Sequence, residues 1–126
     1  MTDNRKPGWM NEMFAALDAG GVPGLFPWLD EDVCFRFAGY PPGRGREQFA
    51  ATWAGMSGHI TSLHHELAQS WDLGDEAICR GEVTYGLDDG RQLSVPFVNV
   101  FKLRDGLISE YLVYVDASAV FGAAPG

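Results

Sequence analysis

The chain has 126 residues, of which 46% are hydrophobic, and its formal net charge is −8. This length fits one domain over residues 1–126 with its own core, and the negative charge argues against a nucleic-acid or anionic-membrane partner, because both require a positive surface field. The N-terminal residues lack the continuous apolar run of a signal peptide, and no run of about 18 apolar residues occurs. We therefore expect a cytoplasmic protein.

The two cysteines, Cys34 and Cys79, lie in apolar stretches without CxxC spacing and without a histidine at metal-ligand spacing. We interpret them as small buried hydrophobic residues in a reducing compartment, with a single disulfide as the alternative. The sequence has no glycine-rich phosphate-binding loop and no cluster of metal ligands, so we expect no cofactor and no metal.

Three helices are expected in the first half of the chain. Apolar residues recur at helical spacing over residues 10–17, and the glycine pair at positions 20 and 21 ends this helix. Pro23 suits the first turn of a second, short helix. Residues 33–37 then alternate as a strand, and the proline- and glycine-rich residues 38–45 form a loop. A third helix begins near Arg46 and carries an apolar stripe.

From Ile60 onward the apolar period changes to two, which is typical of strands. Turn signals at 73–75, 88–90 and 104–106 separate four strands, over about residues 60–72, 76–86, 91–104 and 107–116. Short hairpin turns predict an antiparallel meander. Pro96 cannot donate to the ladder, so it marks a bulge or an edge. Three N-terminal helices packed in a strongly curved, mostly antiparallel sheet make an α+β cone.

Several segments carry a resemblance to a known superfamily. They are DAG at 18–20, LDEDV at 29–33, DGLI at 105–108 and YVD at 114–116. With the order of elements, they make nearly the whole chain resemble the nuclear transport factor 2-like superfamily. The runs RGEVTY at 80–85 and EYLVYVD at 110–116 are most similar to bacterial SnoaL-like domain proteins, which share the ketosteroid-isomerase-like, cystatin-like cone. The resemblance implies a conical internal pocket, open at one end, and an outer sheet face that often forms a homodimer.

The two strands expected at 91–104 and 107–116 are apolar on both faces, with Val98 and Val100 opposite Phe97 and Phe101. Neither face is suited to water alone, and a second subunit is the simplest cover. We therefore expect a homodimer through the outer face.

Ketosteroid isomerases of this fold use a pocket tyrosine, an aspartate base and a protonated aspartate. The resemblance places these positions near Met13, near Phe37 and on Asn99. Two of these residues are apolar, so the steroid-isomerase mechanism is excluded, although an asparagine can still donate a hydrogen bond to a developing oxyanion.

Limonene-epoxide-hydrolase-like members carry Arg-x-Asp on one strand and a second aspartate on another. The first part is similar to Arg80-Gly81-Glu82, but the partner position falls on Val113. The pair that would activate water is incomplete, so epoxide hydrolysis is not favoured.

Glu82 is the remaining candidate for an acid or base. Strand alternation puts it on one face with Arg80, and we expect this face to line the apolar pocket. Burial and the neighbouring cation act on a carboxylate in opposite directions, which together suit proton transfer near neutral pH. The alternative is a structural ion pair between Arg80 and Glu82 at the rim of the sheet.

His65 and Asn99 are the other polar candidates. His65 shares a strand face with two leucines, from which a histidine can carry protons; the alternative is a histidine that is hydrogen-bonded in the core or exposed. Asn99 interrupts an apolar face, and a buried amide needs a partner, which is either a ligand or a side chain such as Glu82 or Tyr111.

Two functions fit these residues. The first is an enzyme for cofactor-free acid/base chemistry, such as isomerisation, cyclisation or hydration, on a small hydrophobic metabolite, with Glu82 as acid or base and Arg80, Asn99 and His65 in support. The second is a non-catalytic binding or dimerisation module. A catalytic pocket should be roomy and hold several convergent polar groups. The expected walls of the pocket are Trp28, Phe37, Tyr40, Trp53, Phe97, Phe101, Tyr111 and Val113.

Overall fold

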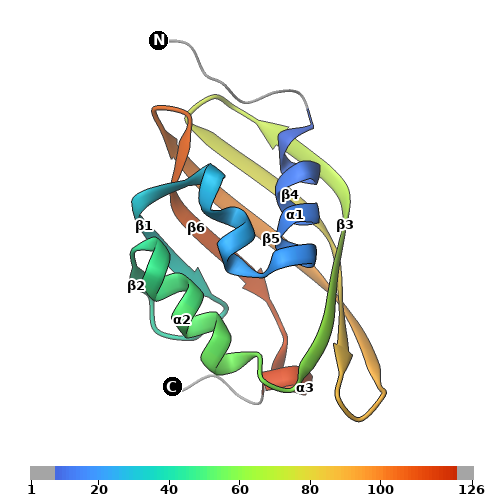
Figure 1. Ribbon diagram of the computed structural model, residues 1–126. Coiled ribbons are helices and arrows are strands. Elements are labelled where there is room, and N and C mark those ends of the chain that lie inside the picture. Colours follow the sequence, from blue (N-terminus) through green and yellow to red (C-terminus); the bar gives the residue numbers. More distant parts are fainter. Residues whose placement is uncertain (1–7, 122–126) are drawn as a thin grey trace.

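Helices pack against one side of a curved six-stranded sheet in the computed structural model, which describes residues 8–121 (Figure 1). The helices are α1 (Trp9–Gly20), the 3-10 helix η1 (Val22–Trp28), α2 (Arg46–Met56) and the one-turn α3 (Ser118–Phe121). The first three confirm the expected helices, and α3 was not expected. The α+β class is confirmed, whereas the single domain over residues 1–126 extends beyond the described residues and stays a prediction.

The sheet has the strand order β2-β1-β6-β5-β4-β3. Its meander is confirmed and consists of β3 (Ile60–Asp72), β4 (Glu76–Leu87), β5 (Gln92–Arg104) and β6 (Leu107–Val115). β1 (Leu29–Phe37) pairs in parallel with β6. The two-residue strand β2 (Gly43–Arg44) pairs with β1, inside the segment that the sequence predicts to be only a loop.

Register shifts add to the curvature of the sheet: one lies in β3 between Leu67 and Gln69, and one lies in β6, where Ser109 is the extra residue opposite Lys102 and Leu103. Pro96 lies just beyond the last β5–β6 pair and has a strand neighbour only in β4. The edge alternative for Pro96 is therefore right and the bulge alternative wrong. β3 crosses so close to β4 that a Cβ at Gly81 would collide with the carbonyl oxygen of Glu66, so this position requires glycine.

The core lies between the helices and the concave face of the sheet. The apolar face of α1, with Met13, Phe14 and Leu17, is buried there. The outer face keeps apolar residues in contact with solvent: Val98 is 38% and Tyr114 is 58% exposed. The predicted two-sided apolar character of β5 is confirmed. Within residues 8–121, no helix has both the length and the apolar character needed to cross a membrane.

Candidate functional site

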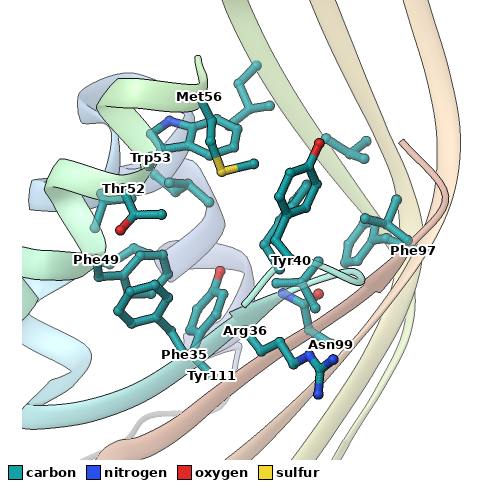
Figure 2. A pocket seen from close by; sticks show the side chains of 18 of the residues that line it. Phe35, Arg36, Tyr40, Phe49, Thr52, Trp53, Met56, Phe97, Asn99 and Tyr111 are labelled. Atoms are coloured by element: carbon teal, nitrogen blue, oxygen red, sulfur yellow. The ribbon is translucent and has the colours of Figure 1, made fainter. Parts of the chain in front are cut away.

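A cavity opens between α1, α2 and the concave face of the sheet (Figure 2). Its volume, counted as the space open to the centres of water-sized molecules, is about 70 Å³. One water needs about 10–15 Å³ on this measure, so the cavity has room for a small organic molecule. The expected residues that the structure places in its wall are Phe37, Tyr40, His65, Trp53, Phe97, Asn99, Tyr111 and Val113.

Two expected wall residues lie elsewhere. Phe101 is fully buried behind the wall, with its ring centroid 5.9 Å from that of Trp9 and 5.1 Å from that of Tyr111. Trp28 ends η1 and packs against the core outside the cavity. The prediction that Phe101 and Trp28 belong to the pocket wall is wrong.

Arg80 and Glu82 are exposed on the outer face of β4, and the Arg80 guanidinium donates to Gln69 Oε1 over 3.3 Å. The side chains of this strand that point inward are buried, and they include Cys79, Val83 and Tyr85. The prediction that Glu82 and Arg80 face the pocket is therefore wrong. Alternation correctly put them on one face, but it does not say which face looks inward.

His65 lies in the pocket wall and has a partner that sequence reasoning missed. Its Nδ1 is 2.6 Å from Asp18 Oδ1, and its backbone N–H donates to Asp18 Oδ2 over 2.7 Å. The ring stacks on Phe14 at 4.6 Å between centroids and meets the edge of Phe97 at 5.3 Å. A carboxylate only accepts, so this geometry assigns the ring hydrogen to Nδ1 and leaves Nε2 as the acceptor when the ring is neutral.

Asp18 occupies an unusual place for an acid. It lies in the last turn of α1, where the partial negative charge of the helix end disfavours a carboxylate. It also follows Phe14 by four residues and so shares the buried face of the helix. An acid at this end and on this face is the sequence signal that points to a partner, and the two hydrogen bonds with His65 compensate the unfavourable position.

Asn99 and Tyr111 form the second polar feature of the wall. Asn99 is 2% exposed, and its side chain acts on the phenol of Tyr111. Burial raises the pKa of Tyr111 well above its usual range, with the Asn99 side chain acting against that shift. Burial raises the pKa of Tyr85 likewise. Both phenols therefore act as neutral hydrogen-bonding groups.

The short helix α3 packs against the wall of the cavity. Its Phe121 contacts three residues of the wall, at ring-centroid distances of 5.3 Å to Phe37, 5.8 Å to Trp53 and 5.7 Å to Tyr85. Figure 1 shows α3 at the end of α2, beside the beginning of β3.

Phe121→Ala should lower the free energy of unfolding by about 1 to 3 kcal/mol, less than in a closed core because Phe121 is half-buried. Hydrogen bonds from the Tyr40 hydroxyl to Phe121 O (3.2 Å) and from His59 Nε2 to Val120 O (2.6 Å) involve only backbone oxygens of α3, so the substitution leaves them in place. Urea unfolding measures the difference. An unchanged free energy would show that α3 does not dock on the wall.

Among residues 8–121, no three His, Cys, Asp or Glu side chains are grouped as metal ligands.

Comparisons place the chain among known proteins. The model of the SnoaL-like domain family matches residues 10–111. A search of curated proteins finds no match. An NTF2-like protein of unknown function from Burkholderia pseudomallei has a similar structure, with a TM-score of 0.79 and 17% identity over 90% of this chain and 95% of the other.

Two further solved structures are similar. One is a protein of ketosteroid-isomerase-like fold from Catenulispora acidiphila in complex with trimethylamine, with a TM-score of 0.79 and 18% identity over 96% of each chain. The other is an LEH-like epoxide hydrolase of M. tuberculosis, with a TM-score of 0.72 and 17% identity over 89% of this chain and 83% of the other. At these identities the similarity establishes the fold, which is the predicted cone.

Proposed function

Because the chain belongs to the SnoaL-like domain family, we propose that it is a small-molecule enzyme in which His65 performs cofactor-free acid/base chemistry. The observation that carries the proposal is the pair of His65 and Asp18, 2.6 Å apart, at the wall of an apolar cavity. The reaction class is isomerisation, cyclisation or hydration of a small hydrophobic metabolite. Each of these reactions transfers a proton to or from the substrate.

His65 and Asp18 have distinct roles in this proposal. The carboxylate holds the Nδ1–H tautomer, so Nε2 takes a proton from the substrate, and the negative charge then stabilises the imidazolium. Returning the proton from Nε2 to another atom completes an isomerisation or cyclisation. Asp18 is a positioning residue that acts through His65.

The wall around His65 favours an uncharged ligand. It is mostly aliphatic and aromatic, and such surroundings strengthen electrostatic interactions because they exclude water. Arg36 is the cation of the wall, and Figure 2 shows its guanidinium directed away from the other labelled side chains. A charged ligand would lose its hydration without gaining an opposite charge inside the cavity.

Epoxide hydrolysis, the activity named for the M. tuberculosis neighbour, has little support in this chain. Its Arg80-Gly81-Glu82 segment has both charged side chains exposed on the outer face. The non-catalytic binding module remains the alternative, because a pocket of this shape binds small molecules with or without chemistry.

A general proton-transfer probe separates these alternatives. A base takes the proton from the ring carbon next to nitrogen in 5-nitrobenzisoxazole. The N–O bond breaks in the same step, and the product is a coloured cyanophenolate. The enzyme proposal requires that the protein accelerate this ring opening through His65. A pocket that binds the probe, as shown by equilibrium titration, without accelerating its ring opening would favour the binding module.

We also propose a homodimer through the outer face. Strand register aligns Trp71, Ile78, Val100 and Leu112 in one apolar row across β3 to β6. Trp71 is 39% exposed, which is unfavourable for a large apolar side chain without a cover. The same surface of a second copy would cover this row in a two-fold symmetric dimer.

Light scattering at micromolar concentration should give the mass of a dimer. The double variant Val98→Glu/Tyr114→Glu should give a monomer, because these two residues are paired between β5 and β6 on the same face and would bring like charges together. A monomeric mass for the unmodified protein would refute the proposal.

We place the reaction in the cytoplasm. Cys34 and Cys79 are both free thiols, the state that a reducing compartment maintains.

A further inference from the structure

One buried polar atom in the pocket wall is unused. Asn99 is 2% exposed, yet its Oδ1 accepts no hydrogen bond from any residue in the described range. Asn99 acts to lower the pKa of Tyr111, which is the effect of a donor, so the group directed at Tyr111 is Nδ2. A buried carbonyl oxygen without a donor is costly, and such atoms are uncommon in folded proteins.

The neighbours of Asn99 in the sheet cannot meet this need. Strand register puts it between Cys79 on β4 and Val113 on β6, which are a weak donor and an apolar residue. Figure 2 shows the Asn99 side chain extending from its strand into the space between Tyr40, Phe97 and Tyr111. A molecule bound in the cavity is therefore placed to supply the donor for Oδ1.

We propose that Asn99 is a specificity-determining residue whose Oδ1 accepts a hydrogen bond from a hydroxyl or N–H group of the substrate. The inference rests on the proposed function, since it describes the substrate of the same pocket. It restricts the substrate class to uncharged, mostly apolar small molecules that carry a hydrogen-bond donor. Saturated hydrocarbons, ethers and ketones without a donor would leave Oδ1 unpaired.

The donor group and the reacting atom occupy one stretch of the wall. Phe97 contacts the His65 ring and precedes Asn99 by two residues on the same face of β5. Two residues of a strand span about 7 Å, which is comparable with the width of a small ring system. A hydroxylated ring lying on Phe97 can thus bind Asn99 at one end and present an atom to His65 at the other.

Three naphthalene probes of similar shape test the proposal by equilibrium titration. They are 2-naphthol, which has a donor, 2-methoxynaphthalene, which has only an acceptor, and 2-methylnaphthalene, which has neither. The Kd of 2-naphthol relative to that of 2-methylnaphthalene should rise by about ten- to a hundredfold in Asn99→Leu, a nearly isosteric change that removes the acceptor. The affinity for 2-methoxynaphthalene should follow that for 2-methylnaphthalene.

Circular dichroism and thermal unfolding check that the Asn99→Leu variant is folded. If it does not fold, Asn99→Val is a smaller substitution that also removes the acceptor. Nuclear magnetic resonance tests the proposal in the unmodified protein. The ¹³C resonance of the Asn99 side-chain carbonyl should move downfield when 2-naphthol is added, but not when 2-methylnaphthalene is added.

Four results would overturn the proposal. The relative affinity for 2-naphthol could stay unchanged in the folded variants. The Asn99 carbonyl resonance could also show the same shift with 2-naphthol as with 2-methylnaphthalene. Asn99→Leu could weaken 2-methoxynaphthalene as much as 2-naphthol, which would make Asn99 a donor. The preference for 2-naphthol could vanish in His65→Phe instead, which would assign the hydroxyl to His65. Because these are binding measurements, they stand or fall independently of whether His65 catalyses proton transfer.

Discussion

His65→Gln is expected to slow the protein-catalysed ring opening of 5-nitrobenzisoxazole by about a hundredfold or more. Glutamine approximates the volume of the imidazole and can still donate to Asp18, so the fold and the affinity for the probe should change little. It has no nitrogen that takes up a proton near neutral pH, so the acceleration should disappear. Stopped-flow absorbance of the released phenolate measures the rate.

His64→Gln is the matched control. His64 is the adjacent residue of β3, its side chain is 71% exposed, and its Nδ1 lies 3.9 Å from Asp18 Oδ2. The rate should stay within about twofold of that of the unmodified protein, because an exposed surface charge contributes little to a reaction in the cavity. Equal losses in both variants, or full activity in His65→Gln, would remove His65 from the chemistry.

Asp18→Asn is expected to lower the same rate by about a hundred- to ten-thousandfold. An amide in place of the carboxylate can donate to Nδ1, and this favours the tautomer with its hydrogen on Nε2. The ring then presents a donor to the cavity where the reaction needs an acceptor. Stopped-flow measurement with saturating probe separates this loss of turnover from any change in binding.

Asp18→Ala serves as the comparison for stability. It removes the acceptors of both the backbone N–H and Nδ1 of His65, and each unpaired buried donor costs about 1 to 3 kcal/mol. Asp18→Asn keeps one acceptor, so its free energy of unfolding in urea should be closer to that of the unmodified protein. If both variants are as stable and as active as the unmodified protein, the contact between Asp18 and His65 has no positioning role.

The order of elements and the shape of the sheet were predictable because each depends on local sequence. The period of two from Ile60 onward and the three turn signals predicted the meander, and its strands end within a residue of their expected limits at most positions. α3 was missed because a single turn at the end of the chain has too few residues for a period. β2 was missed for the same reason.

The polar residues of the site were harder to predict because they depend on which face of a strand looks inward. Alternation put Arg80 on one strand face with Glu82, and His65 on one face with two leucines. It does not by itself show which face of a strand is covered by the helices. In β4 the inward set includes Gly81, which has no side chain to mark that face. In β3 the two leucines that share a face with His65 mark the inward side, and His65 lies in the pocket wall.

The partner of His65 was not predictable from periodicity. Asp18 is 47 residues away in the sequence, and the two meet only because α1 packs against β3. Asn99 was singled out correctly as an amide in an apolar face, and Tyr111 was one of the partners considered for it. That its oxygen stays unpaired depends on side-chain geometry, which no pattern of residue types contains.

The hydrogen on the His65 ring tests the central claim most directly. A long-range ¹H–¹⁵N correlation spectrum, recorded where the ring is neutral, distinguishes a protonated from an unprotonated ring nitrogen. We predict a hydrogen on Nδ1 and none on Nε2 in the unmodified protein, and the reverse in Asp18→Asn. A hydrogen on Nε2 of His65 in the unmodified protein would contradict the account, because the cavity would then contain no proton acceptor at this position.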